Sequence, residues 1–175
     1  PIEWTEDGWF VAKGGDLGQP LAKPSGESVG QHGMALSDEF SGDSLGAQWS
    51  FYDPTQTEYE RLSFGDGTLT LQGKGTQPRD SSPLTVIAGD KSYEFQVEME
   101  IEPGAQGGAL LFYSDKLYVG VGSNGERFIM HRYGEERPSQ IAPSATGGKL
   151  WMRVRNDRHI VTIHTSTDGE TWTKY

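Results

Sequence analysis

The strictest pattern in the sequence is an alternation of apolar and polar residues over nine positions. Every second residue is apolar: Tyr93, Phe95, Val97, Met99 and Ile101. Successive side chains of a β-strand point to opposite faces, so this period predicts a strand with one buried and one solvated face. No segment shows a sustained apolar period of 3.6 residues, which argues against long helices.

Short runs rich in apolar and β-branched residues predict further strands at 68–72, 108–113, 117–121, 128–133, 150–154 and 160–165. Turn residues separate these runs at short intervals. Asn124-Gly125 favours a type I′ hairpin turn, and Asn156-Asp157-Arg158 and Asp168-Gly169 mark two later turns. Short strands joined by tight turns predict an all-β chain folded as an antiparallel sandwich or barrel.

Charge and composition exclude several classes of partner and site. Lys and Arg number 15 against 25 Asp and Glu, for a formal net charge of -10. Such a surface repels phosphate backbones and anionic lipids, so we expect neither nucleic acid nor membrane as a partner. The chain contains no cysteine, which excludes disulfides and thiolate metal sites. The first residues lack a basic start and an apolar core, so they are no signal peptide, and the location stays open between bacterial cytoplasm and secretion.

The chain divides into unequal parts by composition. Residues 1–13 hold three aromatic side chains around the turn Glu6-Asp7-Gly8 and predict one β-hairpin. Residues 14–33 are rich in Gly, Pro, Ser and Lys, which is typical of a linker. The sandwich is expected over residues 34–175.

No catalytic pair of carboxylates can be singled out. Glu94, Glu98 and Glu100 share the polar face of one predicted strand, where carboxylates are normally solvated. The histidines follow no metal-binding spacing, and His159 and His164 are expected on opposite faces of a strand. We therefore predict no catalytic residue in this chain.

Two oxygen-rich or aromatic features could bind a ligand. Asp38 and Glu39 are adjacent carboxylates that could help to hold a structural calcium ion, although a solvated strand start is the favoured alternative. Aromatic rings stack on sugars, which makes candidates of four residues: Tyr113, Tyr118, Tyr133 and Trp151. Packing of Trp151 under a loop or against another domain is an equally weighted alternative.

Several segments resemble a known family of carbohydrate-active enzymes. Pro1-Ile2-Glu3-Trp4-Thr5-Glu6-Asp7-Gly8-Trp9 is similar to the closing segment of the β-propeller of glycoside hydrolase family 43. Ser37-Asp38-Glu39-Phe40-Ser41-Gly42, Ser81-Ser82-Pro83-Leu84 and Gly107-Gly108-Ala109-Leu110-Leu111-Phe112-Tyr113 resemble its C-terminal sandwich. The resemblance implies a concanavalin A-like jelly roll after the last hairpin of a propeller.

The resemblance also implies a function in plant-polysaccharide breakdown, including that of xylan. The family's activities are β-xylosidase and α-L-arabinofuranosidase, and its catalytic carboxylates lie in the propeller. The implied partners are therefore a β-propeller catalytic domain of the same parent protein and a neutral pentose oligosaccharide. By position, Thr76–Pro83 corresponds to a loop that shapes the active-site rim in relatives, with Gln77, Arg79, Asp80 and Ser81 as candidate contact residues.

The sequence departs from the family's pattern in length, and two other functions would also fit it. The family's sandwich continues for several more strands, so the resemblance predicts that the sandwich is truncated at its C-terminus. A stand-alone carbohydrate-binding module, or a sandwich for protein–protein contact, would also fit an all-β chain without catalytic carboxylates. Measurable sugar binding by the isolated chain would favour the first of these alternatives.

Overall fold

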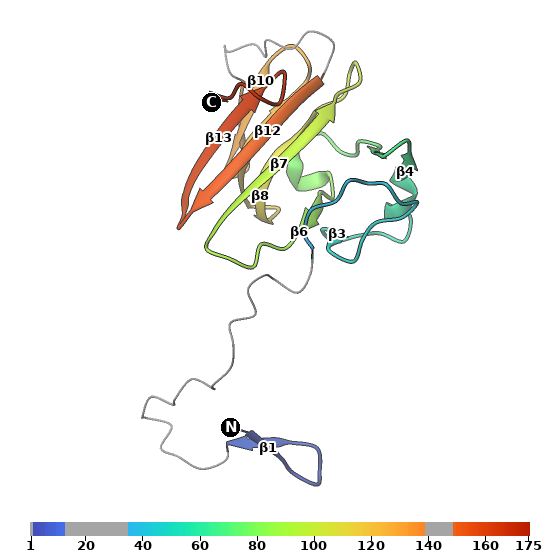
Figure 1. Ribbon diagram of the computed structural model, residues 1–175, viewed down its shortest axis with the longest axis vertical. Coiled ribbons are helices and arrows are strands. Elements are labelled where there is room, and N and C mark those ends of the chain that lie inside the picture. The colour runs from blue at the N-terminus through green and yellow to red at the C-terminus, as the bar shows by residue number, and fades with distance from the viewer. Residues whose placement is uncertain (1, 13–34, 139–148) are drawn as a thin grey trace. The chain divides into compact units, whose positions relative to one another are not determined.

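The computed structural model describes residues 2–12, 35–138 and 149–175 (Figure 1). The predicted linker over residues 14–33 lies outside the described residues. The chain forms two compact units, Pro1–Gly33 and Met34–Tyr175. In the described part of the chain, no helix has the length and apolar character needed to cross a membrane.

The first unit contains an antiparallel hairpin of β1 (Ile2–Trp4) and β2 (Phe10–Ala12). Thr5 closes its turn, because its hydroxyl donates to the carbonyl of Trp9 at 2.9 Å and accepts from the amide of Trp9 at 3.1 Å. Gly8 adopts a φ of 85°, which favours glycine. Trp4 and Trp9 are 68% and 71% exposed, because a short two-stranded hairpin has no core of its own in which to bury them.

The second unit is an antiparallel β-sandwich, as the sequence predicts. One sheet has the order β14-β13-β12-β7, formed by Thr173–Lys174, Ile160–Ser166, Lys149–Asp157 and Ser92–Glu100. The other has the order β11-β10-β9-β8, formed by Glu135–Pro138, Phe128–Arg132, Leu117–Ser123 and Gly107–Ser114. All pairings in both sheets are antiparallel.

Shorter elements precede and connect these sheets. Two strand pairs join β3 (Trp49–Phe51) to β6 (Leu84–Val86) and β4 (Leu62–Gly65) to β5 (Thr68–Leu71). Two single-turn 3₁₀ helices, η1 (Glu58–Arg61) and η2 (Pro78–Asp80), lie between them in sequence. Their short length fits the absence of any helical period in the sequence.

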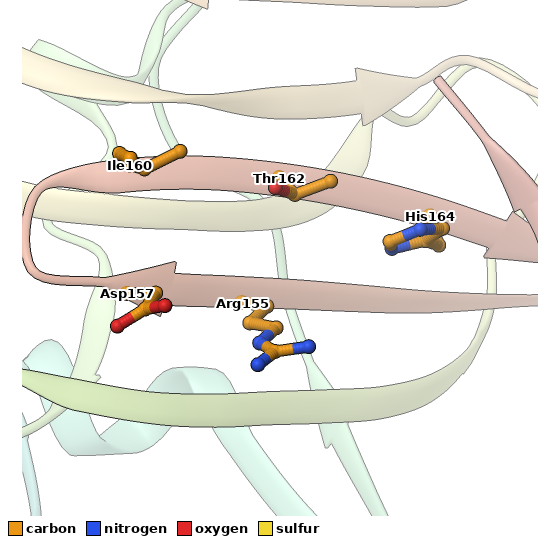
Figure 2. A pocket seen from close by; sticks show the side chains of 5 residues that line it. All are labelled: Arg155, Asp157, Ile160, Thr162 and His164. Atoms are coloured by element: carbon orange, nitrogen blue, oxygen red, sulfur yellow. The ribbon is translucent and has the colours of Figure 1, made fainter.

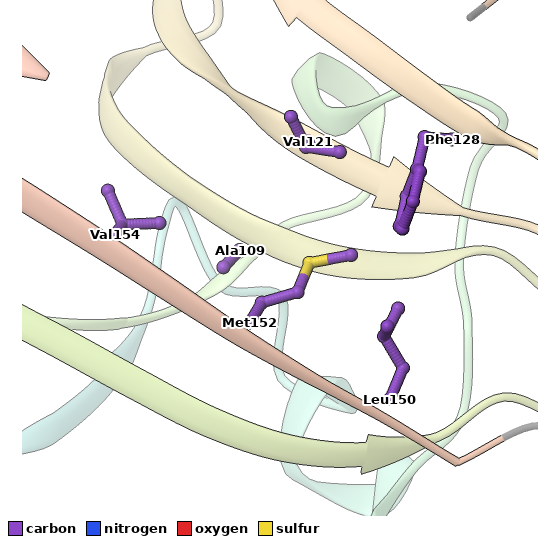
Figure 3. Close-up of a cluster of buried hydrophobic side chains, with 6 residues drawn as sticks. All are labelled: Ala109, Val121, Phe128, Leu150, Met152 and Val154. Atoms are coloured by element: carbon purple, nitrogen blue, oxygen red, sulfur yellow. The ribbon is translucent and has the colours of Figure 1, made fainter. Parts of the chain in front are cut away.

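The core lies between the two sheets (Figure 3). Its fully buried members are Ala109, Val121 and Phe128 from one sheet and Leu150, Met152 and Val154 from β12 of the other. The apolar face predicted from the alternation in β7 packs against this cluster through Phe95, Val97 and Met99. The period of two therefore identified the buried face of β7 correctly.

Two predicted turns differ from the structure. Asn124 has no positive φ, so the turn is not type I′; its side-chain oxygen instead accepts from the amides of Glu126 and Arg127 at 3.0 and 2.9 Å. The turn after β12 is Arg158-His159, with φ values of 48° and 77°, because Asp157 still pairs with Ile160. His159 thus lies in the turn, and only His164 lies on the strand.

The hairpin between β13 and β14 is held by a buried serine and one carboxylate. The Asp168 carboxylate accepts from the amides of Thr171 and Glu170 at 2.7 and 2.8 Å and from the Ser166 hydroxyl at 2.8 Å. The Thr171 amide, then the Glu170 amide and the Ser166 hydroxyl, hold the pKa of Asp168 well below its usual range. These bonds form the turn that the sequence predicts at Asp168-Gly169.

We expect the Asp168→Asn chain to melt a few degrees below the unchanged chain at neutral pH. The depressed pKa of Asp168 means that its charge stabilises the folded state above the ordinary Asp pKa of about 3.9, and that this stabilisation is lost as the pH falls below that value. The difference between the two melting temperatures should therefore shrink between about pH 4 and pH 2. Thermal unfolding followed by circular dichroism over that range measures it.

Asp115→Asn is the matched control. Asp115 is an exposed turn residue between β8 and β9 whose carboxylate makes no hydrogen bond with the described residues. Its variant should melt like the unchanged chain at every pH. A melting difference for Asp168→Asn that stays constant from pH 7 to about pH 2 would contradict the charge-based explanation.

Candidate functional site

The candidate rim loop, Thr76–Pro83, is fixed from within by Asp80. The Asp80 carboxylate accepts from the amides of Gln77 and Thr76 at 2.7 and 2.9 Å and from the Thr76 hydroxyl at 3.2 Å. The Gln77 amide is the main reason that the pKa of Asp80 lies below its usual range. Ser81 adds a bond from its hydroxyl to the carbonyl of Pro78 at 3.0 Å.

Gly75 allows the loop to begin against Asp80. Its φ of 72° favours glycine, and a Cβ placed there would lie 2.3 Å from the carboxylate of Asp80 and 2.6 Å from its carbonyl oxygen. A side chain at this position would displace Asp80 from the amides it binds. The Gly-Lys-Gly-Thr sequence therefore serves the geometry of the loop.

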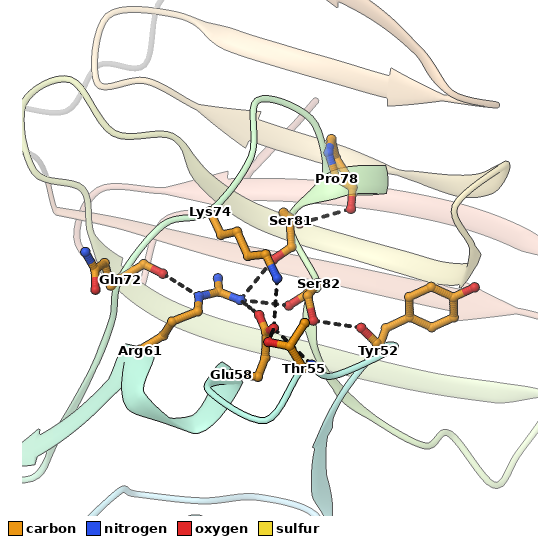
Figure 4. Close-up of polar contacts among 9 residues, drawn as sticks. All are labelled: Tyr52, Thr55, Glu58, Arg61, Gln72, Lys74, Pro78, Ser81 and Ser82. Carbon is orange, nitrogen blue, oxygen red and sulfur yellow. Dashed lines mark hydrogen bonds and ion pairs between the residues drawn. The ribbon is translucent and has the colours of Figure 1, made fainter.

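The base of the loop is held by a charged cluster that includes Glu58, Arg61 and Lys74 (Figure 4). Lys74 Nζ lies 2.8 Å from the Glu58 carboxylate, and Arg61 Nη1 forms an ion pair with the same carboxylate. Arg61 also donates to the carbonyls of Ser81 and Ser82 at 3.0 and 3.3 Å and to that of Gln72 at 2.9 Å. One guanidinium thus connects the chain before the loop with the end of the loop.

Glu58 is the centre of this cluster and is only 1% exposed. Lys74, followed by Arg61 and Thr55, holds the pKa of Glu58 well below its usual range, although burial acts in the opposite direction. Thr55 donates through its hydroxyl at 2.9 Å. A buried carboxylate with two cationic partners and a hydroxyl donor is fully paired, so its role here is to hold structure.

Sequence reasoning missed this cluster. Glu58 and Arg61 are three residues apart, which is a weak helical pairing signal, but nothing in the sequence relates either residue to Lys74 or to Ser81. The link depends on the fold, since it joins η1, the segment after β5 and the end of the rim loop.

A row of aromatic rings connects the end of the loop with the outer face of the β11-β10-β9-β8 sheet. Ser82, at a φ of 45°, donates its hydroxyl to the carbonyl of Tyr52 at 2.7 Å. The Tyr52 ring meets Phe112 edge-on at 4.9 Å between centroids, and Phe112 stacks on Tyr118 at 5.6 Å. His131 follows at 6.3 Å from Tyr118. These contacts pack the loop's end against the sheet.

The four predicted rim residues take different roles. Asp80 and Ser81 bind the loop's own backbone. Gln77 is half-buried, and its side-chain oxygen has no hydrogen-bond partner among the described residues. Arg79 is exposed, and its side chain makes no hydrogen bond or ion pair with the described part of the chain. Of the four, Arg79 is the exposed side chain that has no hydrogen bond or ion pair with the described residues.

The predicted sugar-stacking tyrosines separate by burial. Tyr113 and Tyr133 are 80% and 64% exposed, so their rings are accessible. Tyr118 is only 2% exposed, which corrects the expectation that it presents a ring to solvent. Phe112 stacks on the face of the Tyr118 ring, and burial raises the pKa of the Tyr118 hydroxyl. Tyr118 is therefore a packing residue between Phe112 and His131.

Trp151 follows the packing alternative more closely than the stacking one. It is half-buried, and a Cβ built on Gly169 would lie 3.2 Å from its indole nitrogen. Lys149 Nζ lies 5.2 Å from the centre of its ring. The neighbouring Trp172 is covered by the Arg153 guanidinium at 3.8 Å. Gly169 of the hairpin loop and Lys149 therefore lie beside the Trp151 ring, where a sugar would have to stack.

The predicted calcium residues lie at the start of the sandwich. The Asp38 carboxylate accepts from the Phe40 amide at 2.8 Å, the Trp49 indole at 3.0 Å and the Gln48 amide group at 3.1 Å. Glu39 is exposed. Within the described ranges, no group of three or more His, Cys, Asp or Glu side chains is placed to hold a metal ion. Calcium binding at Asp38 and Glu39 stays a prediction.

The carboxylates of β7 lie where the sequence places them. Glu94, Glu98 and Glu100 are exposed on the outer face of their sheet, and Glu98 pairs with Lys149 at 2.5 Å. Neighbouring carboxylates that are solvated and spread along a strand do not form an acid–base pair around one glycosidic bond. The absence of a catalytic pair from this chain stays a prediction.

Comparison with known protein families places this architecture. The family model of the beta xylosidase C-terminal concanavalin A-like domain matches residues 37–175. The chain belongs to this family. The match covers the whole sandwich unit except its first residues, and it confirms the resemblance found in the sequence as well as the concanavalin A-like fold. A search among curated proteins found no match.

Solved structures agree with this family. A point mutant of the GH43 protein BlXynB from Bacillus licheniformis superposes with a TM-score of 0.70 at 22% identity, over 99% of this chain and 36% of that one. The unmutated BlXynB gives a TM-score of 0.67 at 22% identity, with the same coverage. A xylan beta-1,4-xylosidase from Bacillus halodurans gives 0.67 at 19% identity, over 99% and 37%. At these identities the likeness shows the fold.

The coverage values also show how the chain relates to these proteins. As a GH43 beta-xylosidase C-terminal domain, the chain spans little more than a third of each solved relative. The greater part of each relative therefore has no counterpart in this chain.

Proposed function

We propose that the chain is the non-catalytic accessory sandwich of a plant-polysaccharide glycoside hydrolase of the β-xylosidase or arabinofuranosidase type. In this proposal the sandwich supports a catalytic β-propeller of the same protein, and the loop Thr76–Pro83 shapes the rim of the active-site pocket. The substrate is a neutral pentose oligosaccharide, and catalysis belongs to the propeller.

The observation that carries the proposal is a rigid loop with one free cationic side chain. Asp80 fixes the loop from within, and Arg61 fixes its end through two carbonyls. Arg79 is left exposed at the short helix η2. A guanidinium donates several hydrogen bonds in a fixed plane, which suits the hydroxyl and ring oxygens of a neutral sugar. A loop that is fixed in advance spends little entropy when it contacts substrate.

We expect Arg79→Ala in the parent enzyme to lower kcat/KM on short xylo-oligosaccharides about tenfold, the loss typical of one hydrogen bond from a charged group. Replacing Gln77, Arg79 and Asp80 together by alanine should cost more, because the loop then also loses the bonds of Asp80. Initial-rate kinetics on xylobiose and xylotriose measure both effects.

Arg127→Ala is the control for the loss of one positive charge. Arg127 is exposed in the turn between β9 and β10, and its side chain makes no hydrogen bond or ion pair with the described residues. Its kinetics should match those of the unchanged enzyme. Unaltered kinetics of the triple variant would exclude a rim role for this loop, whatever the stability of the protein.

A further inference from the structure

The outer face of the β14-β13-β12-β7 sheet carries a depression of about 270 Å³ (Figure 2). It is lined by Arg155 and Asp157 of β12 and by Ile160, Thr162 and His164 of β13. The register explains this grouping, because Arg155 pairs with Thr162 and Asp157 with Ile160. Met152 and Val154 point to the core, so the residues that alternate with them face outward.

The pocket has unpaired positive charge. Arg155 is exposed and makes no ion pair with any described residue. Its cross-strand neighbour Glu94 pairs with Arg153 instead, at 3.2 Å. Lys174 is the register partner of His164 on β14, is exposed, and has no ion pair among the residues described. Arg155 therefore brings an unpaired positive charge to the pocket, and Lys174 is the strand neighbour of the lining residue His164, in a chain whose formal net charge is -10.

The other side chains that line the pocket are suited to the hydroxyl groups and the apolar face of a sugar ring. Asp157 accepts from the Ser92 hydroxyl at 2.9 Å through one carboxylate oxygen, and its second oxygen makes no such bond. Thr162 contributes a hydroxyl, and Ile160 is 70% exposed. His164 Nδ1 is buried without a hydrogen-bond partner in the described structure. Polar groups beside an exposed aliphatic side chain match the mixed polar and apolar faces of a pyranose.

We propose that this pocket binds an acidic sugar, a uronic acid residue, with Arg155 and Lys174 facing its carboxylate and Asp157 and Thr162 its hydroxyls. Arg155 can present two parallel donors to a carboxylate. Pockets for drug-sized ligands measure roughly 300–1,000 Å³, so this smaller hollow suits a single sugar unit. The choice of a sugar over other carboxylates rests on the proposed function in polysaccharide breakdown.

The test is an amide NMR titration of the isotope-labelled whole chain with glucuronic acid. We expect saturable shifts at Arg155, Thr162 and His164, with a millimolar dissociation constant, because exposed charge pairs contribute little. Arg155→Gln should weaken binding about tenfold through loss of the paired, charge-assisted bonds. Arg155→Lys keeps the charge, and its affinity should lie between those of the unchanged chain and of Arg155→Gln, since a point charge replaces the planar guanidinium.

The matched control is Arg127→Gln, which makes the same charge change in the turn between β9 and β10 and should bind like the unchanged chain. The amide spectrum of each variant without ligand shows whether it is folded. An equal loss in Arg127→Gln, or the absence of saturable shifts in the unchanged chain, would overturn the proposal.

Two further ligands test separately the role of the carboxylate and the role of the sugar ring. The methyl ester of glucuronic acid keeps the ring but not the charge, and it should fail to bind; binding as tight as that of the free acid would overturn the role of the carboxylate. Inorganic phosphate carries charge without a ring, and equal affinity for it would make the pocket a general anion site and refute the assignment to a sugar. None of these outcomes depends on the rim loop, so Arg79 kinetics test the proposed function separately.

Discussion

The Glu58→Ala chain should melt on the order of 10 °C below the unchanged chain, because removing one partner of a buried charge cluster leaves the other charges unpaired. Arg61 is only 12% exposed and would lose the carboxylate that neutralises it. Its bonds to the carbonyls of Ser81 and Ser82 would then no longer be fixed. We therefore expect the Thr76–Pro83 loop to loosen as stability falls.

Thermal unfolding measures the first effect, and amide hydrogen exchange in Thr76–Pro83 measures the second. Glu60→Ala is the matched control, since Glu60 lies in the same 3₁₀ helix, is exposed, and its side chain makes no hydrogen bond or ion pair with the described residues. Its melting temperature and exchange should stay unchanged. A Glu58→Ala chain that melts within a degree or two of the control would show that the cluster does not hold the base of the loop.

The Met152→Ala chain should lose about 2–5 kcal/mol of unfolding free energy, the usual cost of a large-to-small change in a packed core. Met152 is 0% exposed and lies between the sheets in a cluster with Ala109 and Val121. Both sheets are hydrogen-bonded frameworks, so they can collapse only partly around the cavity. Urea unfolding monitored by tryptophan fluorescence gives the free energy.

Met152→Leu is the control for this prediction. It changes the shape of the side chain but little of its volume, so it should cost less than about 1.5 kcal/mol. If Met152→Ala cost no more than Met152→Leu, the side chain would contribute little to the packing between the sheets, and the assignment of this cluster as the core would be wrong.

The Glu58→Ala and Met152→Ala variants also distinguish an effect of the loop on activity from an effect of overall stability. In the parent enzyme, at temperatures well below unfolding, Glu58→Ala should lower activity on xylo-oligosaccharides, because the proposed rim loop, Thr76–Pro83, loses the contacts that hold its base. Met152→Ala should leave that activity close to normal, since the rim-holding contacts of Glu58, Arg61 and Asp80 do not include it. The same comparison shows whether the rim responds to its own cluster or to overall stability.

Local features of the sequence were sufficient to predict most strands of the two sheets, although not β11. The alternation from Tyr93 to Ile101 gave the strand and its buried face correctly, because a period of two depends only on neighbouring residues. Asp168-Gly169 was predictable for the same reason, since its hydrogen bonds stay within six residues. Even so, the turn at Asn124 differed, because four residues rather than two join its strands.

Tertiary structure alone decided which of the candidate site residues are accessible. Tyr118 and Tyr113 are both tyrosines at the ends of neighbouring strands, yet Phe112 and His131 cover the first, while the second is open to solvent. The sequence by itself determined an acidic all-β chain with a loop of family-like sequence. The fold decided that Glu58 and Arg61 hold this loop and that Arg79 is free, because those contacts join residues that only long-range packing brings together.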